Sequence, residues 1–199
     1  YDVGAGKDAK PNHLFEYAVM GSIYAKEMGN VSNPSVGVLS MGEEESKGNE
    51  LSTAAFALLK NSRLNFIGNV EGRDILTGDI DVIVCDGFVG NIILKFGESV
   101  PKLLKHLLKT TADKNIFDKL RIAIGVGVLK KALKSLDYQE HGGVPLLGVN
   151  GISIIGHGSS TSKAIKNMIL KANEMFDKKL VSKIENSLTE YSNLNLEKT

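Results

Sequence analysis

The sequence predicts an α/β protein built on a mainly parallel β-sheet. Short apolar segments alternate along the chain with longer segments of helical periodicity, which is the order that βαβ units produce. The apolar segments do not alternate strictly between apolar and polar residues, as is typical of strands covered on both faces. With 199 residues, the chain is long enough for one domain with its own core. We therefore expect residues 1–199 to form a single α/β domain.

The individual elements follow from these patterns. Strands are expected where apolar runs are short, at residues 36–39, 65–67, 81–85, 145–149 and 152–155. Helices are expected where apolar residues recur every three or four positions, at residues 12–28, 49–59 and 162 to about 180. Residues 190–199 are mostly polar and have no clear period, which predicts a frayed tail.

The segment 88–136 holds two successive helical patterns and no strand signal. It carries ten Lys and Arg residues against three acidic residues, in a chain whose net charge is +1. We expect a helical hairpin insertion at residues 98–136. In one interpretation its lysines are solvated, and the hairpin packs against its own domain or against a second copy. In the other, the lysines face an acidic partner or an anionic membrane. Self-association and membrane contact are compatible, and both stay open here.

Composition excludes several classes of protein. The nearly balanced charge argues against a dedicated nucleic-acid binder. A single cysteine, Cys85, excludes an internal disulfide and fits a reducing compartment. No apolar run approaches the roughly 20 residues that span a bilayer. The four histidines show no metal-ligand spacing, so no metal site is expected.

The chain starts with Tyr1-Asp-Val-Gly and lacks an initiator methionine. These residues have the character of the end of a buried strand. We expect the sequence to be the C-terminal portion of a longer protein, whose upstream part completes any shared site.

Two of the four glycine-containing segments that follow strand candidates give weak signals. In open α/β sheets such segments border ligand sites. Residues 2–6 hold only a G-x-G pattern, which predicts a tight turn rather than a nucleotide site. In residues 40–50, Glu43, Glu44 and Glu45 are expected either at a helix N-terminus or in a loop that borders a cleft. In the second case Lys47 would contact phosphate or a carrier.

The third segment, residues 85–95, predicts an anion site. A strand ends at Cys85, and a helix is expected to begin near Gly90 or Asn91. Asn91 and Lys95 lie four residues apart and therefore on one helical face. Free backbone N–H groups, an amide and an ammonium would converge there on one anion. The alternative is that Asn91 only caps the helix and Lys95 is solvated.

The fourth segment, "GHGSSTSKAI" at residues 156–165, combines a helix start with a histidine. Its hydroxyls, from Ser159 to Ser162, are all candidate N-caps. Gly156 and Gly158 flank His157, which is either structural or serves in proton transfer or oxyanion stabilisation beside a bound phosphate. Cys85, in contrast, lies within an apolar strand candidate and is expected to be buried filler rather than an acyl-accepting nucleophile.

Several of these motifs together resemble the PlsX family of bacterial phosphate acyltransferases of phospholipid synthesis. The resemblance runs from Tyr1 to about Lys171. The motifs that carry it are Lys10-Pro11, Ala18-Val-Met-Gly21, Gly42-Glu-Glu-Glu45, Lys47-Gly-Asn-Glu50, Phe66-Ile-Gly-Asn-Val-Glu-Gly-Arg-Asp74, Cys85-Asp-Gly-Phe-Val-Gly-Asn91, Pro145-Leu-Leu-Gly-Val-Asn-Gly151 and His157-Gly-Ser-Ser160.

The resemblance implies an enzyme that moves a fatty acyl group from acyl carrier protein to inorganic phosphate, giving acyl phosphate for phospholipid synthesis. It implies a homodimer, no metal or nucleotide cofactor, and a cytoplasmic location with peripheral attachment to the inner face of the cell membrane. It also implies a three-layer α/β/α sandwich similar to phosphotransacetylases and to isocitrate and isopropylmalate dehydrogenases, with the helical hairpin protruding.

The resemblance also assigns site residues. Phosphotransacetylases bind phosphate with a Gly-Asn-x-x-x-Lys helix start and a serine-rich helix start, and this sequence matches those patterns at Gly90, Asn91, Lys95, Gly158, Ser159 and Ser160. Phosphate is itself a nucleophile, so no acyl-enzyme is required. We expect Asn91, Lys95 and His157 to be catalytic, with His157 resting on the local argument alone.

Three alternatives remain from the sequence. A short-chain phosphotransacetylase would use acyl-CoA, and comparing long-chain acyl carrier substrate with acetyl-CoA separates it from the first hypothesis. A non-catalytic, membrane-associated scaffold that binds acyl carrier protein would not need glycines and hydroxyls clustered at strand ends. A nicotinamide dehydrogenase is disfavoured by the incomplete glycine fingerprint.

Overall fold

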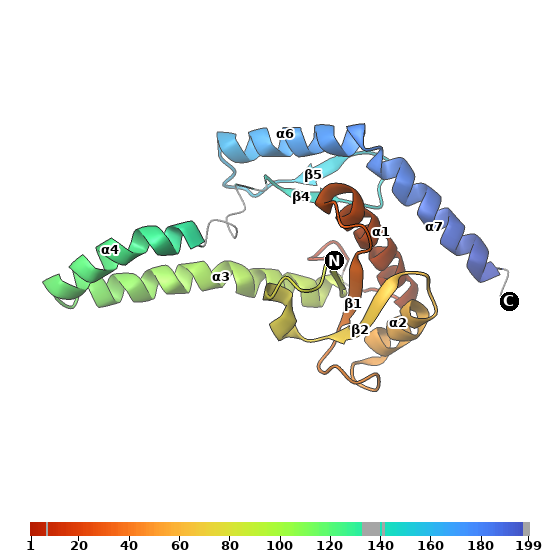
Figure 1. The fold of residues 1–199 in the computed structure, drawn as a ribbon, viewed down its shortest axis with the longest axis horizontal. Coiled ribbons are helices and arrows are strands. Elements are labelled where there is room, and N and C mark those ends of the chain that lie inside the picture. The colour runs from red at the N-terminus through yellow and green to blue at the C-terminus, as the bar shows by residue number, and fades with distance from the viewer. Residues whose placement is uncertain (7, 133–139, 141, 197–199) are drawn as a thin grey trace. The chain divides into compact units, whose positions relative to one another are not determined.

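The computed structural model describes residues 1–6, 8–132, 140 and 142–196. The chain divides into two compact units. Figure 1 labels their helices and strands. The first unit comprises Tyr1–Ile92, Leu147–Ser153 and Asn173–Thr199, and the second comprises Ile93–Leu146 and Ile154–Ala172. A single domain and a three-layer sandwich depend on how the parts pack together, so both stay predictions.

A parallel sheet forms the centre of the first unit. Its strands are β1 (Ser35–Leu39), β2 (Asn65–Val70) and β3 (Val82–Val84), in the order β2-β1-β3. Both neighbouring pairs are parallel, which agrees with the strands expected in this part of the sequence. Parallel strands have their carboxyl ends at the same edge, so the loops after β1 and β3 leave the sheet close together.

Two predicted helices cover this sheet. Helix α1 (Pro11–Gly29) starts with a proline at its first position, where the missing N–H costs nothing. Gly21 brings α1 against β3, because a Cβ there would lie only 2.6 Å from a Val82 methyl group. Helix α2 (Glu50–Lys60) packs against α1 and against β1 and β2.

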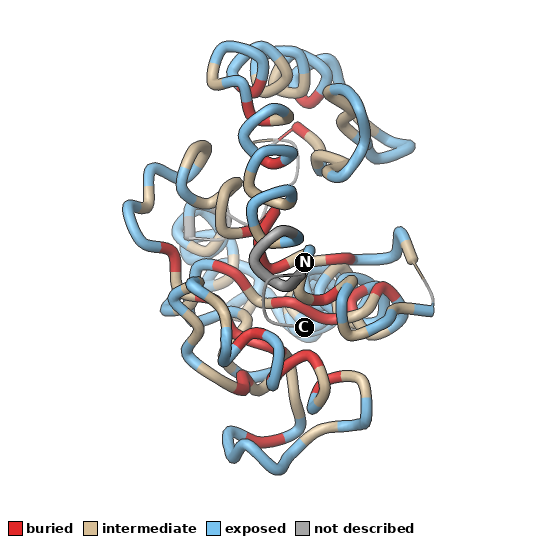
Figure 2. Tube along the Cα trace, turned by 90° about the vertical axis from the view of Figure 1, so that its right-hand side faces the viewer, coloured by how far each residue is buried: buried red, intermediate tan, exposed pale blue. Residues whose placement is uncertain are grey.

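The core of the first unit consists of apolar side chains from these elements. Burial removes apolar surface from water and is the main favourable contribution to folding. Figure 2 marks the buried positions in red. The core cluster comprises Leu14, Ala18, Val36, Val38, Ala55, Phe56, Leu59, Val82 and Val84.

The prediction of a frayed C-terminal tail is wrong for residues 190–196. Helix α7 (Leu180–Leu196) continues through them and packs on α1. The rings of Phe15 and Tyr191 meet edge to face at 5.5 Å, and Leu180 and Ile184 are buried. A polar sequence with a narrow apolar stripe is still a stable helix when that stripe finds a partner. Residues 197–199 lie outside the described residues.

The second unit contains the predicted hairpin and a small sheet. Helices α3 (Gly87–Ala112) and α4 (Ile116–Ala132) are joined by the turn 113–115. Helix α3 begins in the first unit and runs without interruption past residue 98, so the expected insertion has no boundary there. Strands β4 (Val144–Leu146) and β5 (Ser153–Ile155) form a two-stranded sheet, and helix α6 (Ser162–Asp177) follows them.

The hairpin helices expose much of their apolar surface. On α4 the exposed fractions reach 74% at Ile124 and Val128. Contiguous exposed apolar patches are a common feature of protein–protein and membrane contact sites. Within the described part of the chain, no helix is both long and apolar enough to cross a membrane.

Candidate active site at the carboxyl edge of the parallel sheet

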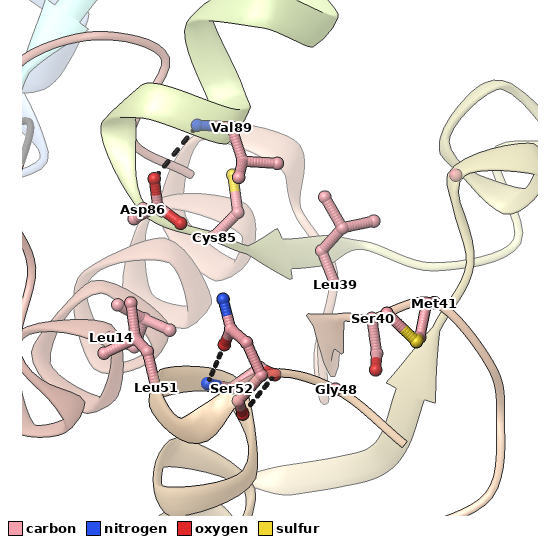
Figure 3. Close-up of a pocket in the computed structure, with 12 residues that line it drawn as sticks. Leu14, Leu39, Ser40, Met41, Gly48, Leu51, Ser52, Cys85, Asp86 and Val89 are labelled. Atoms are coloured by element: carbon pink, nitrogen blue, oxygen red, sulfur yellow. Dashed lines mark hydrogen bonds between the residues drawn. The ribbon is translucent and has the colours of Figure 1, made fainter.

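A pocket of ≈ 290 Å³ opens in the first unit where β1 and β3 end. Ligands of open α/β sheets bind at this edge. Figure 3 shows Asp86 and Val89 on one side of the pocket, with Gly48 and Ser52 on the other. The lining residues are Leu14, Leu39, Ser40, Met41, Gly48, Asn49, Leu51, Ser52, Gly72, Cys85, Asp86 and Val89.

The loop after β1 forms one wall of this pocket, as one of the two interpretations of residues 40–50 expected. Asn49 caps α2, since its Oδ1 accepts a hydrogen bond from the Ser52 N–H at 2.8 Å. Gly48 has φ +125°, a conformation that side-chain-bearing residues rarely adopt. The Ser40 hydroxyl is buried beside Gly48 and has no hydrogen-bond partner among the described residues. Lys47 is exposed and does not line the pocket.

The glutamates of this loop are not at the start of α2, so the helix-dipole interpretation is wrong. Helix α2 starts at Glu50, whereas Glu45 pairs with Lys60 at 2.7 Å and Glu43 pairs with Arg73 at 2.9 Å. The Arg73 guanidinium also lies 2.7 Å from Glu71 and 3.8 Å from Asp74.

This acidic group resembles a metal site in its spacing. Oxygens of Glu43, Glu71 and Asp74 lie within 4.8 Å of one another. The Arg73 guanidinium already supplies a positive charge beside these carboxylates. The hydrogen bond to Glu43, together with the charges of Glu71 and Asp74, raises the pKa of Arg73. The carboxylates therefore have an internal counterion.

The first glycine segment is a tight turn, as predicted. The buried Asp2 carboxylate accepts hydrogen bonds from the N–H groups of Gly4, Ala5 and Gly6, at 3.0, 2.8 and 3.3 Å. A nest of consecutive N–H groups is a typical anion site. Here the anion is a side chain of the same loop, so these N–H groups are not available to phosphate.

The expected start of the third segment's helix, Gly90 or Asn91, is wrong by three or four residues. Helix α3 begins at Gly87, and Asp86 caps it by accepting a hydrogen bond from the Val89 N–H at 2.9 Å. The Gly90 N–H bonds within the helix, to the Asp86 carbonyl at 2.9 Å. The N-terminal field of α3 therefore stabilises the Asp86 carboxylate. Asp86 is thus the anion at the first turn of α3, and an anion held by Asn91 and Lys95 stays a prediction.

Asn91 and Lys95 do lie on one face of α3, one turn apart, but beyond its first turn. Asn91 is exposed, and a Cβ on Gly4 would lie 3.3 Å from its Oδ1. Lys95 forms an exposed ion pair with Glu98 at 3.3 Å. Gly90 is buried. It packs so closely on the loop that a Cβ at this position would overlap the Asp2 carbonyl oxygen. Their predicted roles with phosphate thus rest on the side chains of Asn91 and Lys95.

The fourth segment folds into a turn ahead of α6. His157 Nδ1 lies 2.7 Å from Ser159 Oγ, and the Ser159 N–H donates to it at 3.2 Å. The Ser160 hydroxyl and N–H both donate to the His157 carbonyl, at 2.7 and 2.9 Å. Thr161 is at the N-cap position, since its carbonyl accepts the first helical bond, from Ile165.

This turn keeps its side chains at the surface. His157, Gly158 and Ser159 are exposed, and Ser160 is half-buried. The segment belongs to the second unit, whereas Gly90 and Asn91 belong to the first. One phosphate site shared by the two segments therefore stays a prediction.

Cys85 has the properties expected of a packing residue. Its side chain is buried, and its Sγ lies 3.4 Å from the Tyr1 carbonyl oxygen. Burial raises the pKa of the Cys85 thiol, so it is protonated near neutral pH and is a weak nucleophile.

Comparison with known proteins agrees with the motifs at these strand ends. The model of a family described as "Fatty acid synthesis protein" matches residues 1–183. The chain belongs to this family. It is the PlsX family of phosphate acyltransferases that the motifs resemble.

Several relatives named phosphate acyltransferases are about half identical to this chain. A phosphate acyltransferase of Desulfitobacterium hafniense is 51% identical over 96% of this chain and 58% of its own length. Those of Halothermothrix orenii and Pelotomaculum thermopropionicum are 50% and 49% identical, over 94% of this chain and 57% and 55% of their own lengths. The chain therefore spans somewhat more than half the length of these PlsX relatives.

Three pocket residues of this family member were not expected from the sequence, namely Ser40, Asn49 and Asp86. Two of them left a local signal. Asn49 precedes a helical pattern with Ser52 three residues on, and Asp86 follows an apolar strand directly before glycine. Ser40 left none, because its burial depends on contacts with Gly48.

Proposed function

We propose that the protein carrying this chain transfers a fatty acyl group from acyl carrier protein to inorganic phosphate, forming acyl phosphate in the cytoplasm. Membership of a family whose relatives are named phosphate acyltransferases carries this proposal. The pocket at the carboxyl edge of the parallel sheet supports it, because an enzyme of this fold needs a ligand site there.

The reaction requires positioning more than covalent chemistry. A phosphate oxygen attacks the thioester carbonyl, a tetrahedral oxyanion forms, and the carrier thiolate leaves as the acyl phosphate is made. In this proposal Asn91 and Lys95 bind phosphate together with Gly158, Ser159 and Ser160. Lys95 has to leave Glu98 for phosphate, which costs little because the pair is exposed.

The decisive experiment uses the protein at the full length of its relatives. Long-chain acyl carrier thioester and labelled phosphate are expected to give acyl phosphate and free carrier. Lys95→Ala and His157→Ala are expected to lower the rate by at least about tenfold, a range typical of one lost charge-stabilising or proton-transfer group. Wild-type rates in both variants would remove their assigned roles.

A short-chain phosphotransacetylase is the second candidate, because phosphotransacetylases have a matching Gly-Asn-x-x-x-Lys pattern at Gly90, Asn91 and Lys95. Replacing the carrier substrate with acetyl-CoA separates the two activities. A larger kcat/KM for acetyl-CoA than for long-chain acyl carrier would favour this candidate.

We also propose that the protein is a homodimer attached to the anionic inner surface of the cell membrane. The exposed apolar side chains of α3 and α4, beside exposed lysines, support a surface of this kind. Sedimentation of the full-length protein measures its oligomeric state. A monomer at micromolar concentration would contradict the dimer.

A further inference from the structure

The pocket of the first unit has apolar walls and a small number of polar groups. Leu14, Leu39, Met41, Leu51 and Val89 supply the apolar surface. Sites with this composition bind a mostly apolar ligand and orient it by a few hydrogen bonds.

One polar group of the pocket is left to donate hydrogen bonds. Asn49 uses its Oδ1 to cap α2, at 2.8 Å from the Ser52 nitrogen. Its amide NH₂ has no partner among the described residues. An amide NH₂ carries two donors, so it can bind a carbonyl oxygen of a ligand.

A second polar group of the pocket is left to accept a hydrogen bond. Asp86 uses its Oδ1 to cap α3, at 2.9 Å from the Val89 nitrogen. Its other carboxylate oxygen has no partner among the described residues and can accept a ligand N–H. The pocket therefore offers a donor group from Asn49 and an acceptor from Asp86 between apolar walls, beside the unpaired Ser40 hydroxyl.

The same groups make the pocket a poor phosphate site. No lysine or arginine lines it, and Asp86 brings a negative charge into it. A phosphate dianion beside a carboxylate, without a cation, is repelled. The matching ligand is a neutral chain that carries amide C=O and N–H groups between methylenes.

We propose that this pocket binds the amide-bearing pantetheine arm that carries the acyl thioester, with Asn49 donating to an amide carbonyl and Asp86 accepting from an amide N–H. The inference rests on the proposed function, since the arm is the part of an acyl carrier substrate that presents the thioester. It also divides the site, because phosphate then binds outside this pocket.

The test uses two substitutions that keep both helix caps. Asn49→Asp and Asp86→Asn each preserve the capping oxygen, but each exchanges the free donor and acceptor character. Binding of a non-reactive acyl-pantetheine thioether to the full-length protein is measured without phosphate. We expect each variant to bind at least about tenfold more weakly than wild type, the effect of one lost hydrogen bond to a charged or buried partner. The control is Asn186→Asp, which makes the same change of charge on the exposed face of α7.

Each outcome of this binding test either supports or overturns the assignment of the pocket to the pantetheine arm. Wild-type affinity in both variants, no binding to the wild-type protein, or competition between the thioether and inorganic phosphate would overturn the assignment. Thioether binding that depends on Asn49 and Asp86 without any formation of acyl phosphate would uphold the pocket and refute the proposed function. Repeating the assay with acyl carrier and acyl-CoA shows which source of the arm the pocket accepts.

Discussion

At the scale of single residues, Asp81 ties the beginnings of two strands together. Its Oδ2 accepts hydrogen bonds from both the N–H and the hydroxyl of Ser35, each at 2.8 Å, and its own N–H donates to Ser35 Oγ at 3.0 Å. Ser35 opens β1, and Asp81 directly precedes β3. The hydrogen bonds from Ser35 favour the carboxylate and lower the pKa of Asp81.

This lowered pKa predicts an effect of pH on stability. The contribution of Asp81 is complete above the ordinary pKa of about 3.9 and is lost as pH falls through the lower pKa of the folded state. Asp81→Asn is expected to reduce the free energy of unfolding at pH 7 by about 0.5–1 kcal/mol, a small value because the group is exposed. Urea titrations from pH 7 to 3 should show the difference shrinking. The control Asp79→Asn removes a nearby exposed charge, and an Asp81→Asn effect that is constant with pH would contradict the account.

At the scale of elements, α3 is seated by glycines rather than by large side chains. Its first turn packs so closely on the loop 2–6 that a Cβ on Gly87 or Gly90 would overlap backbone oxygens of Gly6 or Asp2. Gly97, in the same helix, has nothing within 4 Å of the corresponding position. Gly87 and Gly90 thus allow close packing of this helix, whereas Gly97 does not.

The two kinds of glycine should respond in opposite directions to the same substitution. Gly90→Ala is expected to destabilise the protein by about 1–3 kcal/mol through overpacking. Gly97→Ala is expected to stabilise it by about 0.5–1 kcal/mol through helix propensity. Thermal unfolding of both variants measures the contrast. Equal effects would show that the close packing of α3 on the Asp2 turn is unimportant.

The elements also show what the sequence could predict. Strands β1 to β3 and helices α1 and α2 were predicted because their periodicity is local. The start of α3 was missed although its cap, Asp86, is a local signal, because the close packing of Gly87 and Gly90 on the Asp2 turn joins residues more than 80 positions apart in the chain. Helix α7 was missed because its few apolar residues stabilise the helix only when they pack against α1. The pocket could be placed at a strand edge, but the capping role of Asp86, which brings a carboxylate into the pocket, depends on that helix start.

At the scale of the whole molecule, the α3–α4 hairpin concentrates exposed apolar surface next to positive charge. Ile116, Phe117 and Leu120 on α4 are 72%, 71% and 62% exposed, and Lys119 and Arg121 beside them are exposed too. The proposed anionic membrane would match both features, because its acyl chains would take up the apolar side chains and its headgroups would pair with the cations.

A vesicle experiment tests this role of the hairpin. Phe117→Asp is expected to weaken binding of the full-length protein to anionic vesicles by about tenfold or more, through lost apolar burial and added repulsion. Leu76→Asp is the matched control, since Leu76 is 82% exposed outside the hairpin. Cosedimentation at low and high salt separates the contribution of apolar burial from that of charge. Equal loss in the two variants would assign the effect to net charge alone.

The burial of Cys85 has a consequence for observing motion in this protein. It is the only cysteine in the 199 residues of this chain, so every thiol signal from these residues comes from one known position beside β3. A reagent can reach it only when the first unit opens locally, and the labelling rate then measures the free energy of that opening. We expect alkylation of the native protein to be much slower than that of the unfolded chain, and to accelerate with denaturant well below the unfolding midpoint only if β3 opens on its own. The rate at which this thiol is labelled therefore reports on the opening of the sheet at the end of β3.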